Sequence, residues 1–530
     1  MIKNMDGLKL VPYIQQKDKA SSTMTFEDDL FYSMYKIDLN SEVQPFIINS
    51  SNTNSGKLFI RQNPMLYENS SNERKYVELY QTSQSAFQKN ILNQSIENVE
   101  NQEFSQRNLA ELSGVHDFSE LQSNSCSKKV TSFKKLASPN FSAIVDVSGD
   151  CRADIIVHSK DNDNNQYLEF WIYQENGQYC LELEKELKLA ATSTLKGINY
   201  ADFDFNGSTD IILLYENDQQ QPQLQIQQNK YVAKVSSYCD QNNADWGYDN
   251  LESTKAITFE SYILPDLSSY GAGLFNTIRY GDINVDGYND LILILESDGE
   301  MAPYILLNNA DRNDLSFKVQ KDNDMYNLNI LKNNGYKNVL SASFFDINEN
   351  GILDIFINYF DQEENIVKFI ALYNNIRNNN LHLKQAGENG NIDSNDKKVS
   401  TAFYGVTNAC TVQSGTKNYV QQGQQLSQSA YTPLQQPYVI MGLGNTNSYV
   451  SNLKISYPQP DSSGSWYANY EQIIPNSQLL LNPYTESTSK WKIEVIINST
   501  AAVLFVIIFV LGALSCLSCY IIYRHHLRQI

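Results

Sequence analysis

Four short acidic segments carry the residue types and the spacing that bind a hard divalent cation. They begin at Asp146 (DVSGDCRAD), Asp202 (DFDFNGSTD), Asp282 (DINVDGYND) and Asp346 (DINENGILD). Each places oxygen-bearing side chains at its positions 1, 3, 5 and 9, and Ca²⁺ takes roughly six to eight oxygen ligands. A main-chain carbonyl near position 7 and a water would complete each shell, so we expect structural calcium as the cofactor. The sixteen predicted ligands are Asp146, Ser148, Asp150 and Asp154; Asp202, Asp204, Asn206 and Asp210; Asp282, Asn284, Asp286 and Asp290; and Asp346, Asn348, Asn350 and Asp354.

Glycine at position 6 allows a left-handed backbone that curls around an ion without a Cβ clash. Three loops have it, as Gly207, Gly287 and Gly351. The first loop has Cys151 there, and Ser148 at position 3. We therefore expect the Asp146 loop to bind calcium worst, and the Asp282 loop to be the best formed.

Two other interpretations of these loops exist. An EF-hand needs a bidentate Glu at position 12 and flanking helices, whereas an acidic turn between strands is a common solvated connection. Four successive copies favour calcium over plain turns. Position 12 is apolar in every loop and lies in a strand-forming run, which excludes the EF-hand: Val157, Leu213, Leu293 and Ile357.

The elements that must position these loops are strands arranged in repeats. From residue 136 to residue 397 an acidic cluster, an apolar β-branched run and a polar stretch recur, with starts 56, 80 and 64 residues apart. This irregular spacing is typical of propeller blades with variable loops. Residues 1–135 offer only short strand-like pieces at 57–60 and 76–80, and we interpret them as degenerate propeller repeats.

Beyond residue 397 the acidic repeats stop. Residues 398–484 alternate apolar and polar positions, as at 438–444 and 449–457, which predicts a separate β-sandwich. Residues 485–500 form a stalk in this interpretation.

An uncharged apolar run at 501–523 would form a helix of about 34 Å, enough to cross a bilayer. Arg524 and Arg528 follow it, and a basic flank favours a cytoplasmic tail at 524–530 by the positive-inside rule. We expect a single-pass type I protein, with the N-terminal region outside the plasma membrane. Residues 1–20 lack the apolar segment of a signal peptide, so either the N terminus is truncated, which we favour, or the helix is a tail anchor on an intracellular scaffold.

Bulk composition limits the function classes. The net charge of −20 disfavours nucleic-acid binding and suits a protein that collects divalent cations. Five of the seven cysteines lie before residue 490 without zinc-site spacing, and at most two disulfides could join them. Cys516 and Cys519 lie inside the apolar run, where a thiol is usually a small hydrophobic side chain.

The four loops, each followed by a strand, resemble the FG-GAP repeats of integrin α chains. The segments LSQSA (426–430), QPYVIMGLG (436–444) and IIPNSQL (473–479) resemble the T-cell immunomodulatory protein family. Together these similarities cover roughly residues 138–523. The resemblance implies an all-β chain: an FG-GAP/VCBS-type β-propeller, then a C2-like β-sandwich and one C-terminal transmembrane helix. It also implies a surface glycoprotein that binds an extracellular protein or glycan ligand, and no catalytic residues.

Five sequons would be glycosylated if this region is lumenal, namely Asn49, Asn69, Asn93, Asn140 and Asn498. The motifs of zinc proteases, serine hydrolases and phosphate loops are absent from the sequence, and we expect no enzymatic activity. A propeller hydrolase that uses paired carboxylates is the less favoured alternative.

Overall fold

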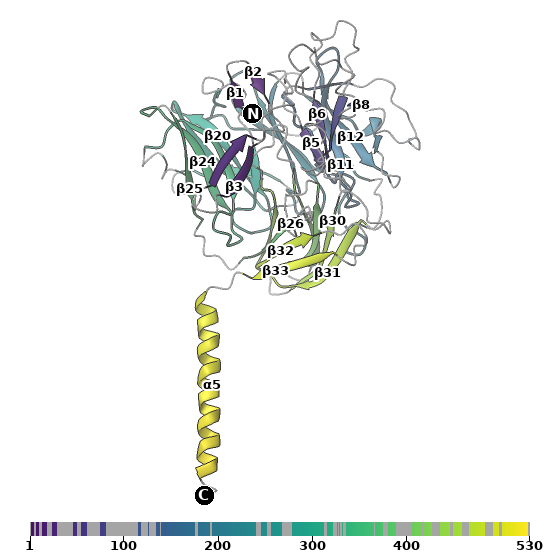
Figure 1. The fold of residues 1–530 in the computed structure, drawn as a ribbon. Helices are drawn as coiled ribbons and strands as arrows, with labels where there is room; N and C mark the ends of the chain where they lie inside the picture. The colour runs from purple at the N-terminus through teal and green to yellow at the C-terminus, as the bar shows by residue number, and fades with distance from the viewer. Residues whose placement is uncertain are drawn as a thin grey trace, which may run out of the picture.

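The protein is an all-β chain that ends in one long helix, as the computed structural model of the full sequence shows (Figure 1). The structure describes eight short strands within the first 117 residues, Cys126, and residues 134–387, 405–482, 491–497 and 501–527. Gaps in these ranges fall at 138, 175–178, 191–192, 240–244, 252–255, 268–277, 312–314, 322–325, 327, 329–330, 332–334, 365, 375–379, 415–416, 427–434, 446–448 and 458–465. The all-β class is confirmed for the described residues.

Four antiparallel sheets follow one another along the repeat region. The first contains β9 (Lys135–Leu136), β10 (Ala143–Val145), β11 (Asp154–Lys160), β12 (Gln166–Tyr173), β13 (Tyr179–Leu181) and β14 (Leu187–Lys188), with the short 3₁₀ helix η4 (Leu183–Lys185). The second contains β15 (Thr194–Ala201), β16 (Asp210–Glu216), β17 (Pro222–Gln227) and β18 (Ala256–Thr258). The third contains β19 (Arg279–Gly281), β20 (Asp290–Ser297), β21 (Glu300–Asn308) and β22 (Phe317–Val319), and the fourth contains β23 (Val339–Phe345), β24 (Asp354–Asp361) and β25 (Ile366–Leu372). Consecutive strands pair within each sheet, except that in the first sheet β9 pairs with β11 and β14 pairs with β12.

Each acidic segment is a hairpin loop between two of these strands, namely β10–β11, β15–β16, β19–β20 and β23–β24. Its position-9 aspartate begins the second strand, as in the pairs Ala201↔Asp210 and Gly281↔Asp290. The flanking elements are therefore strands, as the apolar position 12 predicted.

In the first three sheets, the strand that follows the acidic loop is buried on both faces, so its apolar residues do not alternate with polar ones. In β16, Ile211 and Leu213 belong to the core shared with the first sheet, whereas Ile212 and Leu214 belong to the core shared with the third. In β20 the odd positions face the second sheet and the even positions face the fourth. The sheets thus pack face to face in series.

The outer face of the last sheet is less covered. Val367 and Phe369 on β25 are 57% and 70% exposed.

A β-sandwich of two four-stranded sheets follows the repeats. One sheet has the order β29-β26-β32-β33 and the other has the order β28-β27-β30-β31. Their bounds are β26 (Leu381–Gly387), β27 (Thr407–Ser414), β28 (Lys417–Gln424), β29 (Val439–Gly444), β30 (Val450–Ser456), β31 (Tyr467–Ile473), β32 (Ser477–Asn482) and β33 (Lys492–Ile497).

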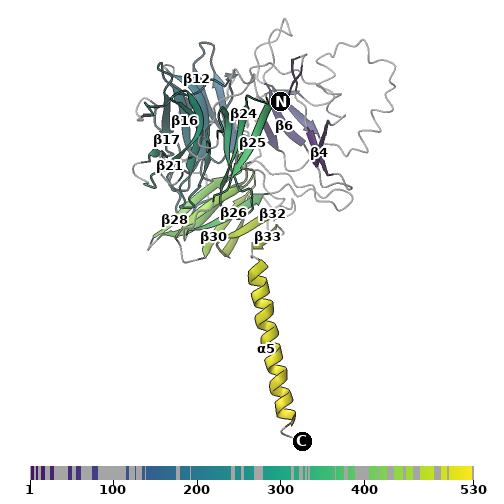
Figure 2. The ribbon, with the colours of Figure 1, turned by 90° about the vertical axis from the view of Figure 1, so that its left-hand side faces the viewer.

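The sandwich is longer than the predicted range 398–484. Strand β26 lies before residue 398, yet it pairs with both β29 and β32. Strand β33 lies in the predicted stalk and pairs with β32. Long-range pairing decides both boundaries, and local sequence does not reveal it. Seen from the side, the sandwich lies between the repeat sheets and the helix (Figure 2).

The N-terminal residues contribute two hairpins and one further four-stranded sheet. The hairpins are β1 (Ile2–Asn4) with β2 (Gly7–Lys9), and β3 (Tyr13–Lys17) with β4 (Met24–Asp28). The sheet contains β5 (Phe46–Asn49), β6 (Ser55–Ile60), β7 (Lys75–Tyr80) and β8 (Val115–Asp117). The strand-like pieces expected at 57–60 and 76–80 are confirmed within β6 and β7.

Helix α5 (Ala501–Leu527) covers the predicted apolar run and continues four residues beyond Tyr523. Figure 1 shows it projecting away from the sandwich. Its side chains are described from Ile508 to Ile522 and at Arg524. In the described part of the chain, no helix combines the length and the apolar character needed to cross a membrane.

Two disulfides are present: Cys126–Cys180 joins the segment before the repeats to the first sheet, and Cys151–Cys239 lies within the repeat region. Two is the largest number that the sequence allowed. Cys410 is free and buried in the sandwich.

Candidate metal centre

The four acidic loops share one backbone conformation. Positions 4 and 6 both have positive φ, as in Phe205 (61°) and Gly207 (78°) of the second loop. Such a φ is costly for residues with a Cβ, and it turns the chain twice within three residues. The equivalent residues are Gly149, Val285 and Glu349 at position 4, and Cys151, Gly287 and Gly351 at position 6.

The first loop is therefore less irregular than its sequence suggested. Its glycine stands at position 4, as Gly149, and Cys151 adopts the left-handed conformation at position 6 with φ of 64°. The disulfide to Cys239 holds this cysteine.

The first aspartate of each loop accepts main-chain hydrogen bonds. Asp282 receives the N–H of Asp286 at 3.0 Å on Oδ1 and that of Gly287 at 2.7 Å on Oδ2. Asp202 and Asp346 accept equivalent bonds from their own loops. Asp146 accepts the N–H of Cys151 on Oδ2 in the same way, but its Oδ1 accepts the N–H of Gly149, at position 4. This carboxylate closes the turn in addition to any metal that it binds.

The ninth position also orders the backbone. Asp290 Oδ2 accepts the N–H of Ile283 at 3.1 Å, and its Oδ1 accepts the N–H of Asn308 at 2.9 Å. Asp154, Asp210 and Asp354 repeat this pattern. The predicted ligands at positions 1 and 9 of all four loops thus have a structural role that the sequence did not reveal.

An asparagine at the end of the third strand links successive repeats. Asn308 Nδ2 donates to the carbonyl of Phe203 in the preceding loop at 2.9 Å and to that of Asn289 in its own loop at 3.2 Å. Asn229 and Asn374 make the same pair of contacts. The sequence signal, an asparagine 18 to 20 residues after the ninth position, was missed.

The second loop gathers three carboxylates tightly enough for a metal ion. Oxygen atoms of Asp202, Asp204 and Asp210 all lie within 4.8 Å of one another, and all three residues are buried. Burial, and then the nearby Asp204, raise the pKa of Asp202 to about 8. Burial, and then the nearby Asp204 and Asp202, hold the pKa of Asp210 well above its usual value. A hard oxygen donor set of this charge fits Ca²⁺, and the bound cation would offset the repulsion.

The acidic side chains of the other three loops have neighbours of their own. In the first loop, Arg152 Nε lies 3.7 Å from Asp150 Oδ2, so the guanidinium offsets part of the negative charge of this loop. In the third, Asn284 Nδ2 donates to Asp286 Oδ2 at 2.9 Å, as Asn206 Nδ2 donates to Asp204 Oδ2 in the second loop. In the fourth, Lys384 Nζ lies 2.6 Å from Asp346 Oδ2. Among the described residues, only the second loop gathers three carboxylates within 4.8 Å of one another, so it fits a divalent cation best, ahead of the Asp282 loop that the sequence favoured. The third loop also offers three carboxylates, whereas Lys384 disfavours a divalent ion at the fourth.

All four loops face the β-sandwich. Gln422 donates through Nε2 to Asp146 Oδ2 at 2.7 Å and through its main-chain N–H to Asp202 Oδ2 at 3.0 Å. A Cβ on Gly442 would lie 1.9 Å from Asp282 Oδ2, so β29 passes directly over the third loop.

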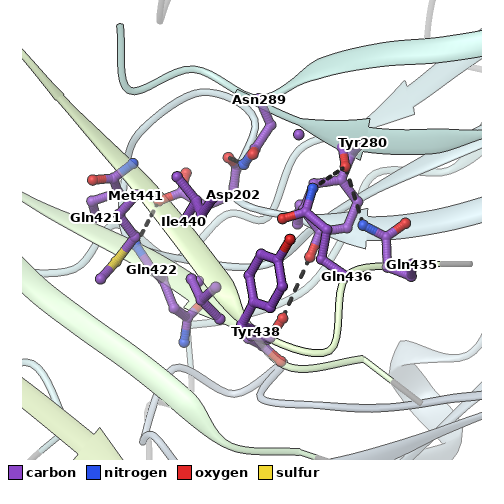
Figure 3. A pocket seen from close by; sticks show the side chains of 15 residues that line it. Asp202, Tyr280, Asn289, Gln421, Gln422, Gln435, Gln436, Tyr438, Ile440 and Met441 are labelled. Atoms are coloured by element: carbon purple, nitrogen blue, oxygen red, sulfur yellow. Dashed lines mark hydrogen bonds between the residues drawn. The ribbon is translucent and has the colours of Figure 1, made fainter. Parts of the chain in front are cut away.

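A small pocket lies at this junction, beside Asp202 and Asn289 (Figure 3). Its lining combines amide side chains, among them Gln421, Gln435 and Gln436, with apolar residues of β29 such as Ile440 and Met441.

A buried histidine of the first sheet and the sequon residue Asn140 lie next to each other in the core. Burial lowers the pKa of His158 to about 4, and its Nε2 lies 2.9 Å from Gln166 Oε1. The sequon residue Asn140 is buried, and its Nδ2 donates to the His158 carbonyl at 3.1 Å, so no glycan fits on it in this structure. Asn49 ends β5, where only the backbone is described, and Asn69, Asn93 and Asn498 lie outside the described residues.

Comparison with known proteins places these features in a family. The family model "ITFG1, C2 domain" matches residues 398–495. A T-cell immunomodulatory protein homolog of Plasmodium yoelii yoelii is 29% identical over 419 residues, which are 69% of this chain and 58% of the relative. The T-cell immunomodulatory protein of Macaca fascicularis is 31% identical over 251 residues, 44% of this chain and 78% of the relative. The chain belongs to the T-cell immunomodulatory protein family.

The mouse member of the family is 27% identical over 416 residues, 72% of this chain and 62% of the relative. The chain thus spans somewhat less than two thirds of the length of the Plasmodium and mouse proteins. The C2 match begins at residue 398, where the sequence placed the start of the sandwich, and extends past residue 484 into the first part of β33. Among solved structures, a fucose-bound Aleuria aurantia lectin mutant aligns with a TM-score of 0.23 and 8% identity, over 70% of this chain and 91% of the lectin.

Proposed function

We propose that this chain is a calcium-stabilised binding protein of the cell surface, whose repeats form part of an FG-GAP β-propeller. The observation that carries the proposal is the convergence of the Asp202, Asp204 and Asp210 carboxylates within 4.8 Å. Buried carboxylates this close repel one another and lose hydration. A Ca²⁺ ion held by them would offset both costs and lock the hairpin.

The role assigned to calcium is structural. The carboxylates at positions 1 and 9 accept main-chain N–H groups, so the ion would reinforce a turn that already orders the backbone. The proposal includes no catalytic step. The serial face-to-face packing of the repeat sheets is the arrangement of neighbouring blades in a propeller, which supports that fold.

The surface location rests on two features. The run 501–523 is uncharged and is followed by Arg524 and Arg528, which supports a single-pass membrane anchor with a cytoplasmic tail. The two disulfides fit an oxidising compartment outside the cytosol. The partner would be an extracellular protein or glycan. The immunological part of the family name is not carried over, since a fold does not fix its partner.

The test compares thermal unfolding of the full chain with calcium and with chelator. Wild type should be more stable with calcium, by about 2.7 kcal/mol for each site saturated at a hundredfold excess over Kd. Asp204→Asn and Asp286→Asn should each reduce this gain and leave stability in chelator nearly unchanged. Asparagine already stands at the same positions in other loops, as Asn284 and Asn206. Alanine at position 1 or 9 would instead remove main-chain acceptors.

Asp218→Asn, in an exposed turn, controls for the change in net charge. Identical unfolding of the wild-type chain with calcium and with chelator would contradict the proposal.

A further inference from the structure

The fourth acidic loop holds a cation that belongs to the chain itself. Lys384, on the first strand of the sandwich, places Nζ 2.6 Å from Asp346 Oδ2, and the two side chains are 11% and 0% exposed. We propose that the Lys384 ammonium takes the place of calcium at this loop. The Asp346 loop is then not a calcium site, and it fastens the sandwich to the repeats without a metal.

Charge separates this loop from the others. The second and third loops each carry three carboxylates, whereas the fourth has Asn350 at position 5 and retains two, Asp346 and Asp354. The ammonium cancels one of these. Calcium affinity rises with the number of charged ligands, and an ammonium beside a ligand carboxylate repels a divalent ion. The remaining charge is too small, and the cation position is too crowded, for Ca²⁺.

The surrounding side chains hold the ammonium in place. Lys384 Nζ lies 4.5 Å from the centre of the Tyr438 ring, and the Tyr438 hydroxyl accepts the N–H of Asp346 at 2.7 Å. His382, two residues earlier on β26, packs against the loop glycine: a Cβ on Gly351 would lie 1.8 Å from its Nε2. The lysine is therefore part of a packed interface, and not a surface side chain that happens to reach a carboxylate.

The sandwich meets the other loops through neutral groups. The donors to Asp146 and Asp202 are the amide and the main-chain N–H of Gln422, and Gly442 lies over Asp282. Neutral donors leave the charge of these carboxylates available to an ion. The contrast with Lys384 thus separates the loops that suit calcium from the one that does not.

This inference rests on the proposed function, and bound calcium measures it directly. The full chain is equilibrated with saturating Ca²⁺, and bound metal is counted by mass spectrometry of the dialysed protein. Lys384→Met should bind one more equivalent than wild type, and Lys384→Met with Asp346→Asn should return to the wild-type count. Lys454→Met, which removes a sandwich lysine that donates to the Tyr238 carbonyl, is the matched control and should not change the count.

Asp346→Asn alone should leave the count unchanged, whereas Asp282→Asn, at the same position of the third loop, should lower it by one. Loss of one equivalent in Asp346→Asn, or no gain in Lys384→Met, overturns the assignment. If Lys384→Met fails to fold, the pair of asparagine variants still decides the question.

A wild-type chain that binds no calcium overturns the proposed function instead. The ion pair is then judged in chelator, where thermal unfolding of Lys384→Met, Asp346→Asn and the double variant should be non-additive. Additive effects would overturn the pairing itself.

Discussion

At the scale of single residues, the first loop shows how a cysteine can replace a glycine. Cys151 holds a left-handed φ of 64°, where the other loops have Gly207, Gly287 and Gly351. In the sequence, this cysteine was one reason to expect weak calcium binding by the first loop. The structure shows that a covalent bond to Cys239 holds the same conformation.

If the disulfide holds this conformation, a glycine at residue 151 should restore part of the stability that is lost when Cys239 is removed. Cys239→Ala should lower the free energy of unfolding by about 2–4 kcal/mol, because the crosslink no longer restricts the unfolded chain. It also leaves a cysteine in a conformation that costs roughly 1–2 kcal/mol for a residue with a Cβ. Cys151→Gly with Cys239→Ala should therefore be about 1 kcal/mol more stable than Cys239→Ala alone, as measured by chemical denaturation. A double variant less stable than the single one would contradict this account.

At the scale of elements, each repeat is a hairpin whose loop, second strand and terminal asparagine belong to one hydrogen-bonded unit. The same unit contacts its neighbour, since Asn308 donates to the loop of the second sheet. The strands of the sandwich add a second contact at the same end of the sheets. Strand β29 comes so near the third loop that only glycine fits at residue 442.

Gly442→Ala should consequently separate these two elements. Its Cβ would lie 1.9 Å from Asp282 Oδ2 and 2.7 Å from the main-chain nitrogen of Gly287. We expect a loss on the order of 1–3 kcal/mol from this overpacking, seen as a lower thermal midpoint and faster proteolysis at the junction. Gly197→Ala is the matched control, because its nearest contact would be an ordinary 3.6 Å. Equal effects of the two variants would show that β29 does not press on the loop.

At the scale of the whole molecule, the sandwich covers the edge of the repeat sheets where the acidic loops lie. The predicted calcium sites therefore lie between the repeat sheets and the sandwich, and do not form an open ligand-binding face. Helix α5 leaves the opposite side of the sandwich (Figure 2).

The proposed anchor predicts how the chain divides between detergent and water. The full chain should enter the detergent phase in a phase-separation assay, and a chain that ends at residue 500 should stay in the aqueous phase. Leu511→Lys with Leu514→Lys should move the protein toward water, because charges in a membrane helix are costly. Val367→Lys, at an exposed apolar position of β25, should not. Aqueous partitioning of the wild-type chain would contradict the anchor.

Much of the fold follows from local patterns in the sequence. The apolar runs after each acidic cluster predicted strands, and their lack of alternation is explained by burial on both faces between neighbouring sheets. The spacing of the aspartates located four equivalent loops, since a hairpin loop is a local structure. The sandwich boundaries were less predictable, because β26 and β33 are defined by partners far along the chain.

The sequence by itself determined where the acidic loops lie, which residues they offer and that strands flank them, because turn chemistry and hydrophobic periodicity act over a few residues. Only the tertiary structure decided what faces each loop. Gln422 contacts Asp146, which is 276 residues away along the chain, and Lys384 contacts Asp346, which is 38 residues away. Local sequence patterns predict neither contact. Four loops that look nearly equivalent in sequence thus differ in charge, because their neighbours come from another part of the fold.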